Sequence, residues 1–152
     1  MKHCKKTILI LLCISTMISF ISCDGGGYYT KLSYSELTNN LLSAEIVTGY
    51  TSDGMDNVSI IKVLDIETVK DNLLSKITQK KQLCTHGPTI PKATYGIRLN
   101  YPDQTIIFDE YTIIHYDASG KMSNYTEKSF IIATTNNEYR NTITSFLDEE
   151  LN

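Results

Sequence analysis

Residues 95–120 read Tyr-Gly-Ile-Arg-Leu-Asn-Tyr-Pro-Asp-Gln-Thr-Ile-Ile-Phe-Asp-Glu-Tyr-Thr-Ile-Ile-His-Tyr-Asp-Ala-Ser-Gly, and this stretch decides the fold of the 152-residue chain. Residues 95–101 alternate between two faces, which is typical of a β-strand. Pro102-Asp103-Gln104 is typical of a tight turn, and Asp117-Ala118-Ser119-Gly120 is typical of a hairpin turn with Gly120 in the left-handed conformation. Together with further β-rich runs, the stretch predicts an antiparallel meander with strands at residues 95–101, 105–108, 111–116 and 122–127. Residues 105–116 are alternatively one long strand with a kink at Asp109-Glu110, and 130–133 either extends the strand over 122–127 or adds another.

The segments before and after the meander predict a hairpin and three helices. Two β-rich runs, 44–50 and 58–64, flank a turn signal and predict the hairpin. Capping-box patterns and apolar spacings of three and four residues predict helices over 34–43, 66–81 and 136–150, whereas 83–94 is predicted to be a loop. We therefore expect an α+β domain: an antiparallel sheet, made of the hairpin and the meander, with two long helices packed on one face.

The order of elements from Val58 onward is strand, helix, about four strands and helix. This layout loosely resembles those of TBP-like and cystatin-like folds. The likeness is one of layout only, because the domain contains no motif of a characterised family, and fold alone does not imply function.

The N-terminus has the organisation of a secretory leader: a basic start, an apolar run over 7–21, and no acidic residue before Asp24. It ends in Phe20-Ile21-Ser22-Cys23, which resembles the lipobox of bacterial lipoproteins. The resemblance implies that a signal peptide, residues 1–22, is cleaved and that Cys23 carries lipid, with a palmitate-type chain on the new amino terminus. Residues 23–32, which begin with a glycine run, are then predicted to be a flexible tether, and 33–152 a single domain. The expected location is the cell envelope, outside the cytoplasm and anchored to a membrane.

Charge and cysteine content restrict the partners of the domain. The leader carries Lys2, Lys5 and Lys6, so the net charge of −3 becomes −6 when it is removed. Such an acidic domain is unsuited to nucleic acid, and its membrane attachment is expected to depend on the lipid at Cys23. Cys84 is the only thiol then left, so no intramolecular disulfide can form. We expect a monomer that folds without cofactor or metal.

The sequence shows no complete catalytic or metal-binding constellation. Cys84, His86 and His115 are candidate zinc ligands or a nucleophile with its base, but no ligand pair has the spacing of a known motif. Asp109, Glu110 and Asp117 are candidate glycosidase carboxylates, but neighbouring residues of a strand point to opposite faces. We therefore predict no catalytic residue, no metal site and no enzyme.

The remaining feature is an abundance of tyrosine: ten tyrosines, all after the leader, and no tryptophan. Tyrosine is enriched in binding surfaces, and two helices on one face of the sheet would leave the other face free. We predict that Arg98, Asn100 and Tyr111 on that face contact a protein or glycan partner. The expected function is a tethered binding or inhibitory module; the alternative is a structural or envelope-assembly accessory.

Overall fold

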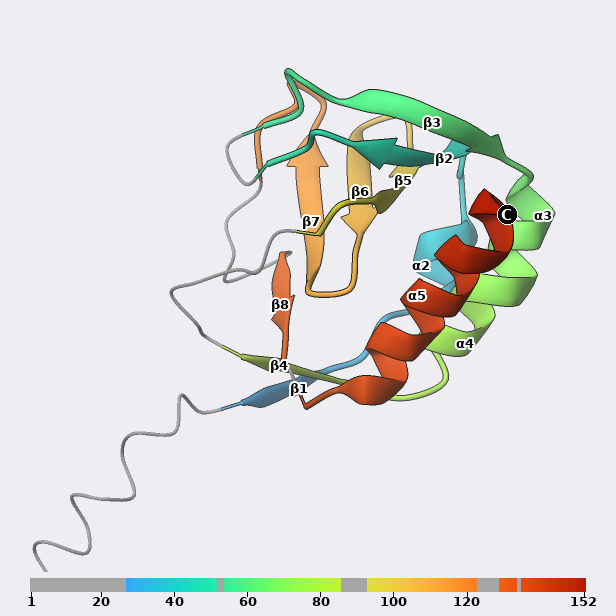
Figure 1. Ribbon diagram of the computed structural model, residues 1–152. Helices are drawn as coiled ribbons and strands as arrows, with labels where there is room; N and C mark the ends of the chain where they lie inside the picture. Colours follow the sequence, from blue (N-terminus) through green and yellow to red (C-terminus); the bar gives the residue numbers. More distant parts are fainter. Residues whose placement is uncertain (1–26, 52–53, 86–92, 123–128, 134) are drawn as a thin grey trace, which may run out of the picture.

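The computed structural model describes residues 27–51, 54–85, 93–122, 129–133 and 135–152. Within these residues the fold is α+β, as predicted. Eight strands form one antiparallel sheet in the order β1-β4-β8-β7-β6-β5-β2-β3 (Figure 1). The strands are β1 (Tyr28–Thr30), β2 (Ser43–Thr48), β3 (Ser59–Leu64), β4 (Gln82–Thr85), β5 (Gly96–Asn100), β6 (Gln104–Phe108), β7 (Thr112–Asp117) and β8 (Phe130–Ile132).

The predicted meander is confirmed as the centre of the sheet. Ile97 lies opposite Phe108, and Phe108 opposite Ile113, so one apolar row crosses β5, β6 and β7. Gly120 has a φ of 78°, as a hairpin turn with a left-handed glycine requires. The predicted strand over 122–127 lies almost wholly outside the described residues, but Met122 forms an isolated bridge with Tyr116.

The predicted hairpin is confirmed as β2 and β3. β2 pairs with β3 on one side and with β5 on the other, so the hairpin extends the meander. A β-bulge interrupts the β2–β3 register at Ile46/Val47. Because a bulge shifts the alternation of side chains, residues on its two sides no longer follow a strict two-residue period.

The helices are shorter or less regular than predicted, with one exception. α3 (Ile66–Val69), the π-helical segment η1 (Lys70–Leu74) and α4 (Ser75–Ile77) form one helical stretch that ends before Lys81. Gln82 ends it: its Nε2 donates to the carbonyls of Ile77 at 2.6 Å and Lys80 at 3.2 Å, which satisfies acceptors that a continuing helix would have used. The exception is α5 (Asn137–Leu151), which matches its prediction.

The predicted helix over 34–43 is wrong in length, because α2 spans only Tyr34–Thr38. Its start follows the capping-box prediction, since the Ser33 hydroxyl accepts from the backbone N–H of Glu36 at 3.4 Å. Its end is set by two asparagines: Asn39 is extended, and Asn40 has a φ of 57°. Asparagine tolerates this left-handed conformation better than most residues, so the chain turns here into β2.

Two segments predicted to lack regular structure are strands. Tyr28, Tyr29 and Thr30 pair with Cys84, Leu83 and Gln82, so β1 and β4 form the far end of the sheet. The predicted tether over 23–32 is therefore wrong for residues 28–30, and the predicted loop over 83–94 is wrong at its start. Leu32 is also buried, so the folded domain begins earlier than residue 33.

The principal core lies between the sheet and the helices. It combines side chains from strands and helices, mainly Ala44, Ile46, Ile97, Leu99, Ile106, Phe108, Ile113, Ile132, Val69, Leu73, Leu74, Ile77, Tyr139, Ile143, Phe146 and Leu147. α5 contacts both η1 and α4, and the two helical stretches lie side by side in Figure 1. Burial of these apolar side chains is the main stabilising contribution to the fold.

Candidate functional site

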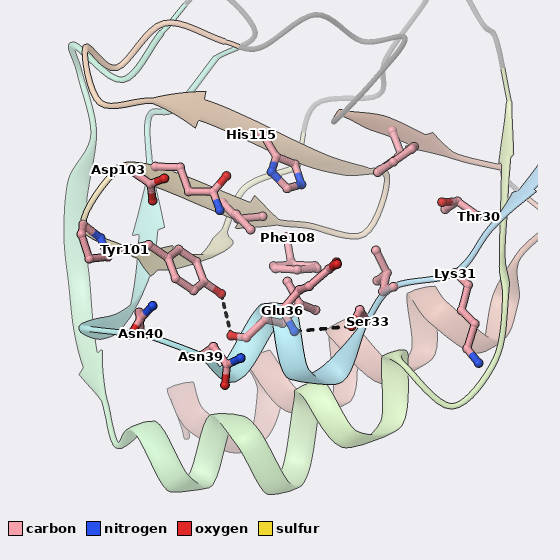
Figure 2. A pocket seen from close by; sticks show the side chains of 16 residues that line it. Thr30, Lys31, Ser33, Glu36, Asn39, Asn40, Tyr101, Asp103, Phe108 and His115 are labelled. Atoms are coloured by element: carbon pink, nitrogen blue, oxygen red, sulfur yellow. Dashed lines mark hydrogen bonds between the residues drawn. The ribbon is translucent and has the colours of Figure 1, made fainter.

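A pocket of about 810 Å³ opens between α2 and the strands β6 and β7 (Figure 2). Its size falls within the roughly 300–1,000 Å³ range of ligand pockets in proteins. Four segments far apart in sequence line it: 30–40, 101–108, His115 and Phe130. The pocket is therefore a product of the tertiary fold and not of a local motif.

The position of α2 depends on its connection to the turn between β5 and β6. Tyr101 is buried, and its hydroxyl donates to the carbonyl of Leu37 at 2.7 Å. The backbone N–H of Tyr101 donates in turn to the carbonyl of Gln104 at 2.9 Å, which closes the turn predicted at Pro102-Asp103-Gln104. These two bonds fix the distance between the two sides of the pocket.

The pocket has an apolar floor and a polar mouth. Its floor consists of apolar side chains from α2, β6, β8 and the segment between β1 and α2. These are Leu32, Leu37, Ile106, Phe108 and Phe130. In Figure 2, Glu36 rises from α2 into the pocket, and His115 points into it from β7. The mouth is also lined by Lys31, Asp103 and several amide and hydroxyl side chains, so it carries two carboxylates and one ammonium group.

Arg98 and Asn100, which the sequence predicted to bind a partner, lie together on the face of the sheet opposite the principal core. Arg98 Nε donates to Glu45 Oε2 at 2.6 Å, and the same carboxylate accepts from Asn100 Nδ2 at 3.1 Å. Asn100 also contacts Ser43 at 2.9 Å. The side chains of Arg98 and Glu45 are only 17 % and 12 % exposed, so their charges mainly satisfy each other.

Tyr111, the third predicted partner-binding residue, lies apart from these two. The guanidinium of Arg140, on α5, stacks over its ring at 5.0 Å from the centroid, a cation–π contact. Tyr111 lies just before β7, next to the turn that Asp109 organises. The structure therefore brings together Arg98 and Asn100 but not Tyr111.

The face predicted to be free is partly covered by a second, smaller core. Val47, Tyr50, Ile107, Ile114 and Tyr116 are buried there, and Met55, Val58 and Met122 pack against them. The hydroxyl of Tyr116 donates to the carbonyl of Thr51 at 2.8 Å. Tyr50 and Tyr116 are thus buried on this face, with Met55 and Val58 from the segment between β2 and β3 packed against their cluster.

Asp109 is a buried carboxylate at the turn between β6 and β7. Its Oδ1 accepts from the backbone N–H groups of Tyr111 and Thr112, both at 2.7 Å. Its Oδ2 accepts from the hydroxyls of Thr112 at 2.7 Å and Tyr50 at 2.9 Å. Burial raises the pKa of Asp109 and outweighs these hydrogen bonds, which lower it. Because every bond joins the carboxylate to the turn or to the second core, its role is structural.

The other candidate catalytic and metal-binding residues do not converge in the described part of the chain. Cys84 is fully buried in β4, and burial raises the pKa of its thiol to about 11, which disfavours a nucleophilic role. His115 lines the pocket from β7, whereas His86 lies outside the described residues. Among those residues, no three of His, Cys, Asp and Glu gather where they could hold a metal ion.

Two further observations complete the description of the chain. Within the described ranges, no helix has the length and apolar character needed to cross a bilayer. Comparison with known proteins finds no matching family model, no matching curated protein and no matching solved structure. The likeness to TBP-like and cystatin-like layouts therefore stays a prediction.

Proposed function

We propose that the chain is a lipid-anchored, extracytoplasmic binding module without catalysis, and that it takes its ligand in the pocket beside α2. The observation that carries this proposal is the pocket itself, with its apolar floor and polar mouth. Ligand sites combine these features, because apolar contacts supply affinity while a few polar groups fix orientation. In this proposal the two helical stretches shield one face of the sheet, and the short α2 leaves the pocket beside it.

The pocket is proposed here as the binding site in place of Arg98, Asn100 and Tyr111. The polar groups of Arg98 and Asn100 already bond to Glu45, and the ring of Tyr111 is occupied by Arg140. A partner would have to break these contacts before it could use them. Glu36 and Asp103 are exposed, so a ligand can use them without such a loss.

The charge at the mouth favours one class of ligand. Glu36 and Asp103 outnumber Lys31 there, and the domain as a whole is acidic. Electrostatic complementarity selects among ligands of similar shape, so a cationic group at the mouth is preferred to an anionic one. We propose an amphipathic ligand with an apolar chain beside Phe130, the partly exposed side chain of the floor, and an amine or guanidinium near Glu36 and Asp103.

A matched pair of probes tests this proposal. Octylamine and octanoate have the same chain length and opposite charge, and binding can be followed through the backbone amide NMR signals of α2 and of residues 101–104. Octylamine should shift these signals at several-fold lower concentration than octanoate. Glu36→Gln combined with Asp103→Asn should remove most of that preference, whereas Asp71→Asn, an exposed carboxylate outside the pocket, should not.

The outcomes separate the two parts of the proposal. If both probes shift the pocket signals equally, the pocket binds apolar chains but the proposed charge preference is wrong. If neither probe shifts them at millimolar concentration, the pocket is not a site for this class of ligand. Shifts spread over the whole domain would indicate general partitioning and would also count against it.

The anchor is tested separately. Metabolic labelling with a palmitate analogue should mark the chain, and Cys23→Ala should remove the label while Cys84→Ser retains it. Label that persists in Cys23→Ala would overturn the lipoprotein part of the proposal.

The alternative function, an envelope-assembly accessory, is favoured by one observation, the exposed edge of the sheet at β3.

A further inference from the structure

β3 is the end strand of the sheet at the side opposite β1, within the described part of the chain. Five of its six residues are exposed. They include Ile60, Ile61 and Val63, which are 53 %, 48 % and 69 % exposed. An exposed edge strand with β-branched side chains offers unpaired backbone groups to another strand, and most proteins protect such edges.

The usual protection by charge is weak at this edge. Lys62 is the only charged residue of β3, and its ammonium lies 2.9 Å from the Glu150 carboxylate of α5. It lies opposite Ile46, whose side chain belongs to the principal core, so Lys62 projects to the helix side of the sheet. On the other side, Val63 lies opposite Glu45, whose carboxylate is held by Arg98. That outer side of the edge therefore presents apolar side chains next to an ion pair that is already formed.

The β-bulge makes the exposed stripe continuous. Ile60 and Val63 are three positions apart, so they would project to opposite faces of a regular strand. Ile60 lies opposite Val47, and Val63 lies opposite Glu45, on either side of the shift in register. Val47 and Glu45 both project away from the principal core, so the bulge places Ile60 and Val63 on the same outer face.

We propose that β3 pairs with β3 of a second copy of this chain, antiparallel and centred between Ile61 and Lys62. In this register Ile60 of each copy lies opposite Val63 of the other copy. The twofold axis therefore generates two equivalent contacts between outer apolar side chains. A register centred on Lys62 would set two ammonium groups opposite each other, which is unfavourable. A register centred on Ile61 would set Ile60 against Lys62 and would leave Val63 against Ser59.

Such an interface is small, so the pairing is weak and depends on the local concentration of the chain. A single pair of six-residue strands buries much less than the roughly 1,200–2,000 Å² of a stable complex, so dilute chains should be monomeric, as the sequence led us to expect. The expected pairing rests on the lipid anchor proposed above: attachment of both copies to one membrane surface confines them and raises their effective concentration. We therefore expect β3 pairing in membranes.

Disulfide trapping of the full chain in membranes tests the register. One copy carries Ile60→Cys and the other, differently tagged, carries Val63→Cys. Paired Cα atoms of antiparallel strands lie about 4.5–5.5 Å apart, within disulfide range. Two copies of Ile60→Cys would place their cysteines roughly 10 Å apart along the strands, beyond that range. Oxidation should therefore link the mixed pair several-fold more than either variant alone, above the level of the parent chain.

A second substitution tests the physical cause. Ile61→Lys, added to both copies, places two further ammonium groups at the centre of the paired strands and should remove most of the mixed cross-link. Tyr29→Lys, at an exposed position on the opposite edge strand, should leave it intact. Membrane attachment is first confirmed by the palmitate label on the chain. In labelled chains, equal cross-linking of mixed and single variants, or none, would overturn the proposal; so would cross-linking that survives Ile61→Lys. Circular dichroism of each variant checks that the sheet is retained.

Discussion

Replacement of Asp109 by alanine should destabilise the chain more than any other change at the turn between β6 and β7. The carboxylate accepts four hydrogen bonds, two from backbone N–H groups and two from hydroxyls. Asp109→Ala leaves the N–H of Thr112 buried without this acceptor, and each buried donor left unsatisfied costs roughly 1–3 kcal/mol. Tyr50 keeps a second acceptor, the Tyr95 carbonyl at 3.1 Å. We expect a total loss of about 3–4 kcal/mol.

Asp109→Asn provides the matched control. The asparagine Oδ1 can still accept from the N–H groups of Tyr111 and Thr112, and the two hydroxyls can rotate to meet its amide. The expected loss is about 1 kcal/mol, because only the arrangement at Oδ2 changes. The difference in stability between Asp109→Ala and Asp109→Asn therefore measures the contribution of the hydrogen-bond acceptor. The difference between Asp109→Asn and the parent measures the effect of the buried charge.

The measurement is urea unfolding of the chain beginning at Asp24, followed by circular dichroism and by the fluorescence of its ten tyrosines. The midpoints should fall in the order parent, Asp109→Asn, Asp109→Ala, with similar slopes. A loss below about 1 kcal/mol for alanine would refute the reasoning, since it would mean that water replaces the carboxylate. An equal loss for both variants would show that the charge, and not the acceptor, matters.

The same residue predicts a pH dependence. Because burial raises the pKa of Asp109, the folded chain holds this proton more tightly than the unfolded chain. Its contribution to stability is therefore greatest at low pH and falls as the pH rises from the unfolded value, about 3.9, through the folded one. The stability advantage of the parent over Asp109→Asn should shrink across that window, and an advantage that grows would contradict the assignment.

Three further predictions concern burial, close packing and the edge of the domain. Cys84 should resist N-ethylmaleimide at pH 7 in the folded chain and react fully in urea, as peptide mass mapping would show, because its thiol is buried and its pKa is raised to about 11. Gly96→Ala should lower the stability by about 1–3 kcal/mol in thermal unfolding, since a Cβ there would lie 2.6 Å from Ile107 Cγ2 and 2.8 Å from Tyr50 Cε1. A chain beginning at Leu32 should unfold at lower urea than one beginning at Asp24, because it lacks β1; equal midpoints would show that β1 adds nothing to the sheet.

Local patterns were enough to predict the centre of the fold. The alternation over 95–101, the turn at Pro102 and the left-handed Gly120 are properties of short segments, and their structures follow from backbone and side-chain preferences. The helix starts at Ser33 and Asp65 are equally local, since each cap accepts from an N–H three residues later. Such features need no knowledge of distant contacts.

The short edge strands could not be predicted in this way. β1 has three residues and β4 has four, which is too few to establish a two-residue period. Each becomes a strand because the other pairs with it, across more than fifty positions of sequence. The glycine run before Tyr28 instead favoured a flexible tether. The lysines before Gln82 favoured the end of a helix.

The candidate site was missed for a related reason. Glu36, Asp103, Phe108, His115 and Phe130 line one pocket, but no two of them are close in sequence except within the β5–β6 hairpin. The predicted free face failed because Tyr50 reaches Asp109, 59 positions later, and so helps to bury the sheet. A weak signal was present: Ile106 and Phe108 are two positions apart in a β-rich run, so both were expected on one face of a strand.

The proposed pocket and the proposed edge contact have no residue in common and can therefore work independently. Lys31, at the mouth of the pocket, follows β1 directly, and the seven residues from Asp24 to Thr30 span at most about 25 Å. If Cys23 carries lipid, the pocket mouth lies near the membrane surface. β3 contributes no residue to the pocket, whose nearest lining strand, β6, is three strand spacings away, or about 14 Å across the sheet. Pairing through β3 would therefore leave both pockets accessible, and copies trapped through Ile60→Cys and Val63→Cys should bind octylamine as well as the untrapped chain does. A loss of binding on trapping would show that the two surfaces are coupled through the sheet.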